Sequence, residues 1–290
     1  MPELPEVETV RVGLSIFLPG KRIADVWYDW PKGFPNAAAD VRRFLLAADI
    51  TGVRRRAKVL IIDLSSNYSL VIHLKMTGQL VYRGEHERFG AGHPNDSLVG
   101  ELPDKTTHVV LTFADGSKLF FNDQRKFGWM RLLPTAAVEQ LDFFQKVGPE
   151  PLDSDFTAEA FIVRLYRRPK SSIKAVLLDQ TILAGVGNIY ADESLWGAKI
   201  HPLAKVQDIS PAKLYRLYEA LRAVLWLSIE KGGSTDRNYV NHEGKRGSYL
   251  TFANVFRREG QPCPRCATTI IKIKAAGRGT HLCPTCQYLS

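Results

Sequence analysis

The feature that most constrains the fold is the spacing of the four cysteines, all of which lie in the last thirty residues. They form two Cys-x2-Cys pairs separated by sixteen residues: Cys263, Cys266, Cys283 and Cys286. Each pair brings two sulfurs to one side of a tight turn, and two turns complete a four-thiolate zinc site. Two disulfides are the alternative, which a chain without a secretory signal disfavours. Because four thiolates fill the coordination sphere of zinc, the sequence predicts one structural zinc ion.

A basic hairpin is expected between the two cysteine pairs. Residues 270–274 alternate in part and predict a strand, and residues 276–280 predict a turn into a return strand. Arg278 lies in this turn between two glycines, where the backbone can come close to a phosphate. A solvated arginine without a partner is the alternative interpretation of Arg278.

The first half of the chain is rich in strand patterns after one helix. Residues 5–17 suit a helix, and residues 23–133 consist mostly of β-branched runs separated by turns. The clearest runs are 59–64, 69–74, 108–113 and 118–122. Residues 83–105 are rich in glycine, proline and charged residues without periodicity, which predicts a long surface loop. This half is therefore expected to be a β-sandwich or barrel preceded by a helix.

The composition changes at Pro134, and helical periodicity dominates the second half. Residues 148–151 predict an extended linker. Four later stretches have helical periodicity: 157–167, 171–179, 190–196 and 211–231. Residues 185–188 break this region with a tight turn, and residues 232–247 are irregular. The predicted fold class is α+β, with several domains.

The charge balance indicates a polyanionic partner. The chain has 39 lysines and arginines against 30 acidic residues, which gives a net charge of +9. A protein with such an excess of positive charge usually binds nucleic acid. The alternative is a basic surface that serves only solubility. The start of the chain lacks the features of a secretory signal, and its apolar runs are too short to span a bilayer. A soluble, cytoplasmic protein is expected.

The start of the chain is a candidate reactive site. Removal of Met1 would leave Pro2 as a secondary amine, and an α-amino group titrates near pH ~7.7–8.0, far below a lysine. Such an amine is a good nucleophile toward carbonyl and C1′ carbons. An ordinary helix start is the alternative, since Pro5 needs no donor there and Glu6 and Glu8 face the positive end of the helix dipole.

Six motifs, in order along about 280 residues, resemble the formamidopyrimidine-DNA glycosylase family. They are Pro2-Glu3-Leu4-Pro5-Glu6, Arg56-Ala57-Lys58, His73-Leu74-Lys75-Met76-Thr77-Gly78, Asp123-Gln124-Arg125-Lys126-Phe127-Gly128, Gly185-Val186-Gly187-Asn188-Ile189-Tyr190-Ala191 and the four cysteines. The resemblance implies an N-terminal catalytic β-sandwich domain over residues 1–133 and a linker over 134–150. It further implies a helix–two-turn–helix domain over 151–256 and a zinc finger over 257–290.

The resemblance also implies an activity, the excision of oxidised purines from double-stranded DNA by a monomer that associates with the nucleoid. Pro2 would attack C1′ of the damaged nucleotide and form a Schiff base, after which elimination cuts the strand on both sides of the sugar. Glu3 would transfer protons at the sugar ring and the base. Lys58 and Arg278 would complete the catalytic set as phosphate-gripping side chains.

The remaining family positions would bind DNA. His73 and Asn188 would contact phosphate, although an isolated histidine in an apolar strand is more often a core residue. Met76, Arg125 and Phe127 would fill the void that a flipped-out base leaves, with Arg125 donating to the orphaned cytosine. Taken singly, Met76 and Phe127 would usually be core residues.

Several positions carry weaker assignments or differ from the family pattern. Glu6 is given a supporting role, with stabilisation of the helix dipole as the alternative. Gln124 and Lys126 stand where many relatives have proline and arginine, and Lys75 replaces a small residue. Residues 235–249 correspond loosely to the lesion-recognition loop.

Two other functions compete with this interpretation. The sister enzyme endonuclease VIII prefers oxidised pyrimidines, but it usually has glycine where Leu4 stands and lacks the arrangement of Arg125 and Phe127. A non-catalytic protein that binds damaged DNA could use the same clamp, but no expected catalytic residue is missing to support it.

Overall fold

The computed structural model describes residues 2–93, 95–234 and 249–289. The chain divides into two compact units, and each is described by itself. The first contains residues 2–146 together with 231–234, and the second contains residues 147–230 together with 249–289. Among the described residues, no helix has the combination of length and apolar composition needed to cross a bilayer.

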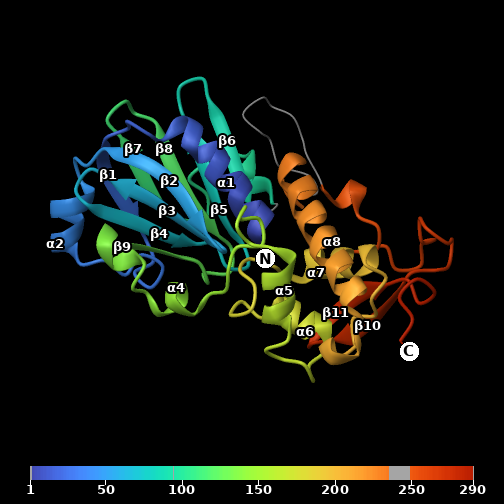
Figure 1. Ribbon diagram of the computed structural model, residues 1–290. Helices are drawn as coiled ribbons and strands as arrows, with labels where there is room; N and C mark the ends of the chain where they lie inside the picture. Colours follow the sequence, from blue (N-terminus) through green and yellow to red (C-terminus); the bar gives the residue numbers. More distant parts are fainter. Residues whose placement is uncertain (1, 94, 235–248, 290) are drawn as a thin grey trace. The chain divides into compact units, whose positions relative to one another are not determined.

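The first unit is built on two antiparallel sheets, which confirms the predicted sandwich (Figure 1). The five-stranded sheet has the order β1 (Ile23–Tyr28), β7 (Thr107–Phe113), β8 (Lys118–Asp123), β5 (Gly78–Arg83) and β6 (Arg88–Gly92). The four-stranded sheet has the order β2 (Ile50–Arg56), β3 (Val59–Leu64), β4 (Tyr68–His73) and β9 (Trp129–Pro134). The four strand patterns identified in the sequence correspond to β3, β4, β7 and β8, within about a residue at each end.

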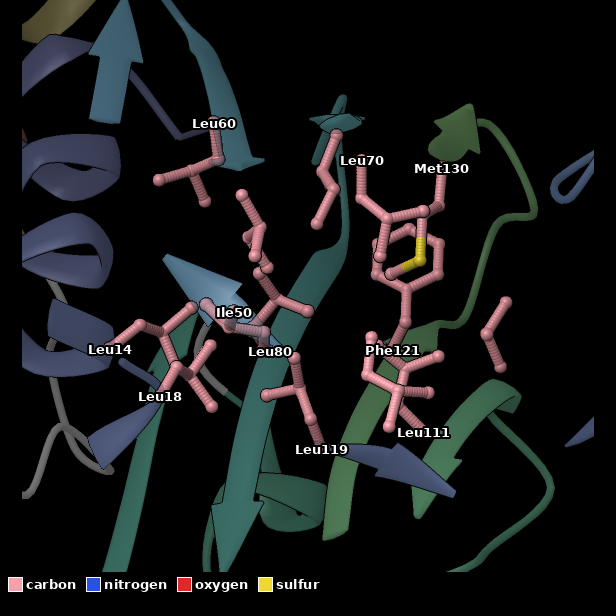
Figure 2. Close-up of a cluster of buried hydrophobic side chains, with 14 of the residues drawn as sticks. Leu14, Leu18, Ile50, Leu60, Leu70, Leu80, Leu111, Leu119, Phe121 and Met130 are labelled. Atoms are coloured by element: carbon pink, nitrogen blue, oxygen red, sulfur yellow. The ribbon is translucent and has the colours of Figure 1, made fainter. Parts of the chain in front are cut away.

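One apolar core fills the space between these sheets (Figure 2). Leu60 and Leu70 point into it from the four-stranded sheet, and Leu80, Leu119 and Phe121 point into it from the other. Alternate residues of the same strands lie on the outer faces, where short helices and loops cover them. Both faces of β3 are therefore buried, which explains why its sequence is almost continuously apolar.

Helix α1 (Leu4–Phe17) closes one side of the sandwich, as predicted for residues 5–17. It packs against β2 and β6, which are the edge strands of the two sheets on that side (Figure 1). Val7, Val10 and Leu14 join the common core from this helix. A short helix, α2 (Ala38–Asp40), continues into a π-helical turn over Val41–Leu45.

The structure differs from the sequence interpretation at two places in this unit. Residues 83–105 are not entirely a loop, because β6 pairs with β5 along its whole length and a 3-10 turn follows at Asp96–Leu98. The pattern of β6 was missed because two of its five residues are glycine. The expected linker 134–150 contains two short helices, α3 (Thr135–Val138) and α4 (Asp142–Lys146), which cover the outer face of the four-stranded sheet with Val138 and Phe144.

The second unit begins with four helices around their own apolar core. They are α5 (Ala158–Leu165), α6 (Ile173–Leu178), α7 (Asn188–Gly197) and α8 (Pro211–Glu230), at the positions predicted from periodicity. Thr157 and Ser172 cap α5 and α6 with their hydroxyl oxygens. Gln180 stabilises the turn between α6 and α7 by bonding the backbone of Gly185 and Val186.

The zinc-finger hairpin completes this unit. Strands β10 (Ile271–Ala275) and β11 (Arg278–Leu282) pair in register from Ile271–Leu282 to Ala275–Arg278. Ala276 and Gly277 connect them with positive φ angles of 50° and 70°, as a tight two-residue hairpin turn requires. Arg278 is therefore the first residue after the turn, exposed at the tip of the hairpin as the sequence predicted.

Candidate active site

The start of α1 brings together the residues expected to carry the chemistry. Glu3 is the N-cap of the helix, and it forms a reciprocal capping box with Glu6. The backbone N–H of Glu3 donates to Glu6 Oε2 at 2.7 Å. Both carboxylates are buried, with 4% of Glu3 and 5% of Glu6 exposed, and Pro2 immediately precedes them. The capping box thus fixes the backbone next to Pro2 and holds two carboxylates beside it.

Glu6 has a second backbone partner in the same unit. Its Oε1 accepts a hydrogen bond from the N–H of Ser234 at 2.8 Å. Gly233 lies against the Glu6 side chain with a φ of +85°, and a Cβ there would approach Glu6 to 3.3 Å. Glu6 therefore fixes both the helix start and the last described residue before 235–248. Of the expected lesion-recognition residues 235–249, only Tyr249 is described, and it is buried; residues 235–248 lie outside the described residues.

Arg55 connects α1 with the turn that carries Lys58. Its guanidinium donates to Glu8 Oε2 at 2.8 Å and to the carbonyl of Ala57 at 2.8 Å. Burial works against ionisation of Glu8, but the guanidiniums of Arg11 and Arg55 hold the pKa of Glu8 below its ordinary value. Lys58 follows Ala57 in the turn between β2 and β3 and is itself buried. The Arg55 bridge thereby ties the backbone next to Lys58 to α1.

His73 is held neutral at the end of β4. Burial, helped by the positive charges of Lys75 and Lys58, lowers the pKa of His73 to about 3. The backbone N–H of Lys75 donates to His73 Nδ1 at 2.9 Å, so the ring proton is on Nε2. A neutral imidazole with an Nε2–H is a hydrogen-bond donor, which suits contact with a phosphate oxygen.

Two adjacent loops carry the predicted void-filling residues. Met76 lies between β4 and β5, and Arg125 and Phe127 lie between β8 and β9. Asp123 fixes the second loop, because its Oδ2 accepts the N–H groups of Phe127 at 2.8 Å and Gly128 at 2.6 Å. The hydroxyl of Thr77 donates to Asp123 and accepts the N–H of Arg125, so it links the two loops.

The side chains on the second loop are presented to solvent as one unit. The guanidinium of Arg125 lies 4.7 Å from the centre of the Phe127 ring, a cation–π contact, and 51% of Phe127 is exposed. A core residue would bury its ring, whereas this ring is exposed on a loop that a buried aspartate holds in place. The alternative of Phe127 as a core residue is therefore wrong, and the ring is available as a wedge.

In the second unit, Asn188 and the hairpin of Arg278 are in direct contact. Asn188 begins α7, and its Nδ2 donates to the carbonyl of Gly279 at 3.0 Å. Its Oδ1 is buried and has no hydrogen-bond partner among the described residues. The start of α7 also carries the positive end of the helix dipole, which favours an anion. The expected phosphate-binding pair is thus adjacent within this unit.

A buried ion pair fixes that hairpin onto the helices. Lys174 on α6 and Asp192 on α7 are both fully buried, and Lys174 Nζ lies 2.5 Å from Asp192 Oδ1. Lys174 Nζ also donates to Thr280 Oγ1 at 2.6 Å. Asp192 Oδ2 accepts the backbone N–H of His281 at 2.9 Å. These contacts hold the two residues that follow Gly279, and so they help to fix the position of Arg278.

The cysteines form the expected metal centre. Their four sulfur atoms all lie within 4.8 Å of one another, close enough for one ion to bind all four. The indole N–H of Trp196 on α7 donates to Cys263 Sγ at 3.4 Å, a bond that stabilises a thiolate ligand. The donor set fits one structural zinc ion held by Cys263, Cys266, Cys283 and Cys286.

Comparison with known proteins agrees with this geometry. Residues 1–130 match the formamidopyrimidine-DNA glycosylase N-terminal domain, residues 147–239 match its H2TH domain, and residues 260–287 match the zinc finger found in FPG and IleRS. The formamidopyrimidine-DNA glycosylase of Pelotomaculum thermopropionicum is 42% identical over 288 residues, which cover 99% of both proteins. The chain belongs to this family. The enzyme of Roseiflexus sp. is 43% identical and covers 99% of this chain and 100% of its own length.

Solved structures of the family also match the chain over nearly its whole length. The complex of Lactococcus lactis Fpg with DNA that contains an abasic site has a TM-score of 0.86 and 35% identity, and it covers 99% of this chain and 100% of its own. A complex of a mutant of the same protein with Fapy-dG DNA gives the same TM-score, identity and coverage.

Sequence reasoning proposed candidate functional side chains but not the residues that hold them in place. Thr77 and Asp123 fall within quoted motifs, yet the pattern gave no sign that they link two loops. Lys174 and Asp192 lie on helices that were predicted only as core elements. The sequence did contain one signal for this ion pair, a charged residue on the apolar face of a predicted helix. Such a residue is rarely buried unless it has a partner of opposite charge.

Proposed function

We propose that this member of the family is a bifunctional DNA glycosylase and AP lyase, which removes 8-oxoguanine and formamidopyrimidines from double-stranded DNA. We further propose that it acts as a monomer in the cytoplasm, where it associates with the nucleoid. The observation that carries the proposal is the start of α1, where Pro2 adjoins two buried carboxylates joined in a capping box. The names of its relatives and the DNA complexes of its structural neighbours support the same substrate class.

The proposed reaction begins at the nitrogen of Pro2 after Met1 is removed. The amine bonds to C1′ as the glycosidic bond breaks, and the departing base takes up a proton. Opening of the sugar gives the Schiff base, with Glu3 supplying a proton at the ring oxygen. Loss of a C2′ proton then expels the 3′ phosphate, and a second elimination expels the 5′ phosphate. Glu6 contributes by keeping Glu3 in place through its hydrogen bond to the Glu3 N–H.

The other residues are proposed to hold the DNA during this reaction. Lys58 and His73 would contact phosphates from the first unit, and Asn188 and Arg278 would do so from the second. Extruding a base from the duplex costs roughly a few kcal/mol of lost stacking and pairing. Met76, Arg125 and Phe127 would occupy the vacated space and so offset part of this cost. The net charge of +9 supports a duplex as the partner.

Borohydride trapping tests the proposal directly. Protein of the mature mass should become covalently linked to a duplex that contains 8-oxoguanine opposite cytosine, and much less to one that contains thymine glycol. Preference for thymine glycol would indicate an enzyme for oxidised pyrimidines. Tight binding without any covalent product would indicate a non-catalytic damage-binding protein and would contradict the proposal.

The role of Arg278 gives a separate prediction. We expect Arg278→Ala to weaken duplex binding and to reduce the slope of log K against log salt concentration by about one. The reason is that one phosphate contact is lost, and with it about one released counterion. Fluorescence anisotropy over a range of salt concentrations measures the slope. Lys170→Ala, at an exposed position elsewhere in the same unit, is the control for net charge. An unchanged slope for Arg278→Ala would argue against phosphate contact.

A further inference from the structure

Three basic residues lie in one row across the five-stranded sheet, with Arg83 in the middle. Arg83 on β5 pairs in register with Arg88 on β6 and with Lys118 on β8. Residues paired in register share one face of a sheet, and like charges placed directly opposite are destabilising. No ion pair joins any of the three to an acidic residue within the described parts of the chain. The sheet therefore maintains a positive cluster without a salt bridge, which we call the β5 basic triad.

A cavity of about 310 Å³ opens beside the β5 basic triad. Its walls include all three basic residues, with Glu101, Leu102 and Phe120 and several glycines. Loop residues 100–102, which belong to the long stretch between β6 and β7, form one side. With three positive charges and one negative, the lining has a net charge of +2. A cavity of this size and charge suits a small dianion.

Arg83 is held as a fixed donor at this cavity. Its guanidinium donates to the carbonyl of Leu98 at 3.0 Å and to that of Tyr82 at 3.2 Å. These bonds occupy only part of its five N–H donors. Burial and the positive charge of Arg88 lower the pKa of Arg83, and Glu101 opposes this shift. Burial is the larger cause, so Arg83 is a partly desolvated cation with a second guanidinium nearby.

The cavity is distinct from the proposed active site in the same unit. Gly78, which pairs with Asp123 near the Met76 and Phe127 loops, begins β5, and Arg83 ends it. Six residues of strand span roughly 17 Å, so the cavity and those loops lie at opposite ends of β5. A ligand in this cavity would therefore bind independently of the proposed glycosylase activity.

We propose that the cavity at the β5 basic triad binds a phosphate group. Planar guanidinium groups match phosphate oxygens in pairs, and a lysine adds a point charge. A phosphate dianion balances the net charge of +2, and the volume leaves room for the group that bears the phosphate. The phosphate comes either from a free phosphomonoester or from the backbone of a nucleic acid.

Thermal unfolding at constant ionic strength tests this inference, with inorganic phosphate as the probe and chloride as the reference. The wild-type midpoint should rise with phosphate along a saturating curve. Arg88→Gln and Lys118→Gln should each raise the midpoint without phosphate by about 1–3 °C, because each removes a like-charge contact. Each should also weaken phosphate binding by about ten-fold or more, because a charge-assisted hydrogen bond is lost. Arg83 is left intact because it also holds the loop.

The control is Lys32→Gln, an exposed lysine of the same unit that is not part of the triad. It should change neither the midpoint nor the phosphate response. Absence of saturable binding, or equal phosphate responses in wild type and both triad variants, would overturn the proposal. A deoxynucleoside monophosphate that binds more tightly than phosphate would identify a free phosphomonoester as the source. If Arg88→Gln instead lowers the slope of log K against log salt concentration for binding to an undamaged duplex, the source of the phosphate is the nucleic acid backbone.

Discussion

Glu3→Gln is expected to lower the rate of base excision by about 10²–10⁴-fold while DNA affinity stays near the wild-type value. The amide of glutamine keeps the shape of the side chain and can still accept the hydrogen bond that caps α1. It cannot donate or take up a proton at the sugar ring or at the base. Single-turnover excision of 8-oxoguanine opposite cytosine measures the rate, and anisotropy measures the affinity.

Two further variants separate chemistry from structure at this helix start. Glu85→Gln removes one acid with an 87% exposed side chain from the same unit and should leave the rate unchanged. Glu6→Gln should lower both the rate and the unfolding midpoint, because both Glu6 oxygens accept backbone N–H groups and an amide can offer only one acceptor. If Glu3→Gln turned over at the wild-type rate, Glu3 would have no part in proton transfer.

The strands of the sandwich could be predicted from the sequence where buried positions are occupied by apolar residues with a high strand preference. In β3, both faces are covered, so five of the six residues are apolar and the run is unmistakable. In β6, the sequence Arg-Phe-Gly-Ala-Gly has almost no intrinsic strand preference. That strand exists because β5 pairs with it and because Phe89 packs into the shared core beside α1. Such tertiary stabilisation cannot be read from a local pattern.

In the candidate active site, too, contacts between residues close in sequence could be predicted, whereas contacts between distant residues could not. Pro2, Glu3 and Glu6 are neighbours in the sequence, so their meeting at one helix start could be predicted. Thr77 and Asp123 are 46 residues apart, and the hydrogen bond between them depends on the order of β5 and β8 in the sheet. Motifs gave their identity, but only the fold shows that one aspartate positions both loops.

Lys174→Met is expected to lower the free energy of unfolding of the zinc-loaded protein by about 3–5 kcal/mol. The methionine fills much of the volume of the lysine stem, but Asp192 would remain fully buried without its counter-charge. Lys174 Nζ and Thr280 Oγ1 are also joined, so the hairpin of Arg278 would lose one of its attachments to α6. Guanidinium chloride unfolding measures the stability, and duplex affinity reports the displacement of Arg278.

The pair can be tested against simple loss of packing with a second variant. Lys174→Met combined with Asp192→Asn removes the unpaired charge and keeps an oxygen that can accept the His281 N–H. This double variant should recover a substantial part of the lost stability, which a packing defect alone would not allow. Lys170→Met, at an exposed position in the same unit, should change stability by less than about 0.5 kcal/mol. Removing one partner of a stabilising buried pair leaves the other charge unpaired in an apolar interior, which is costly. A Lys174→Met protein as stable as this control would therefore show that the pair contributes little to the free energy of unfolding.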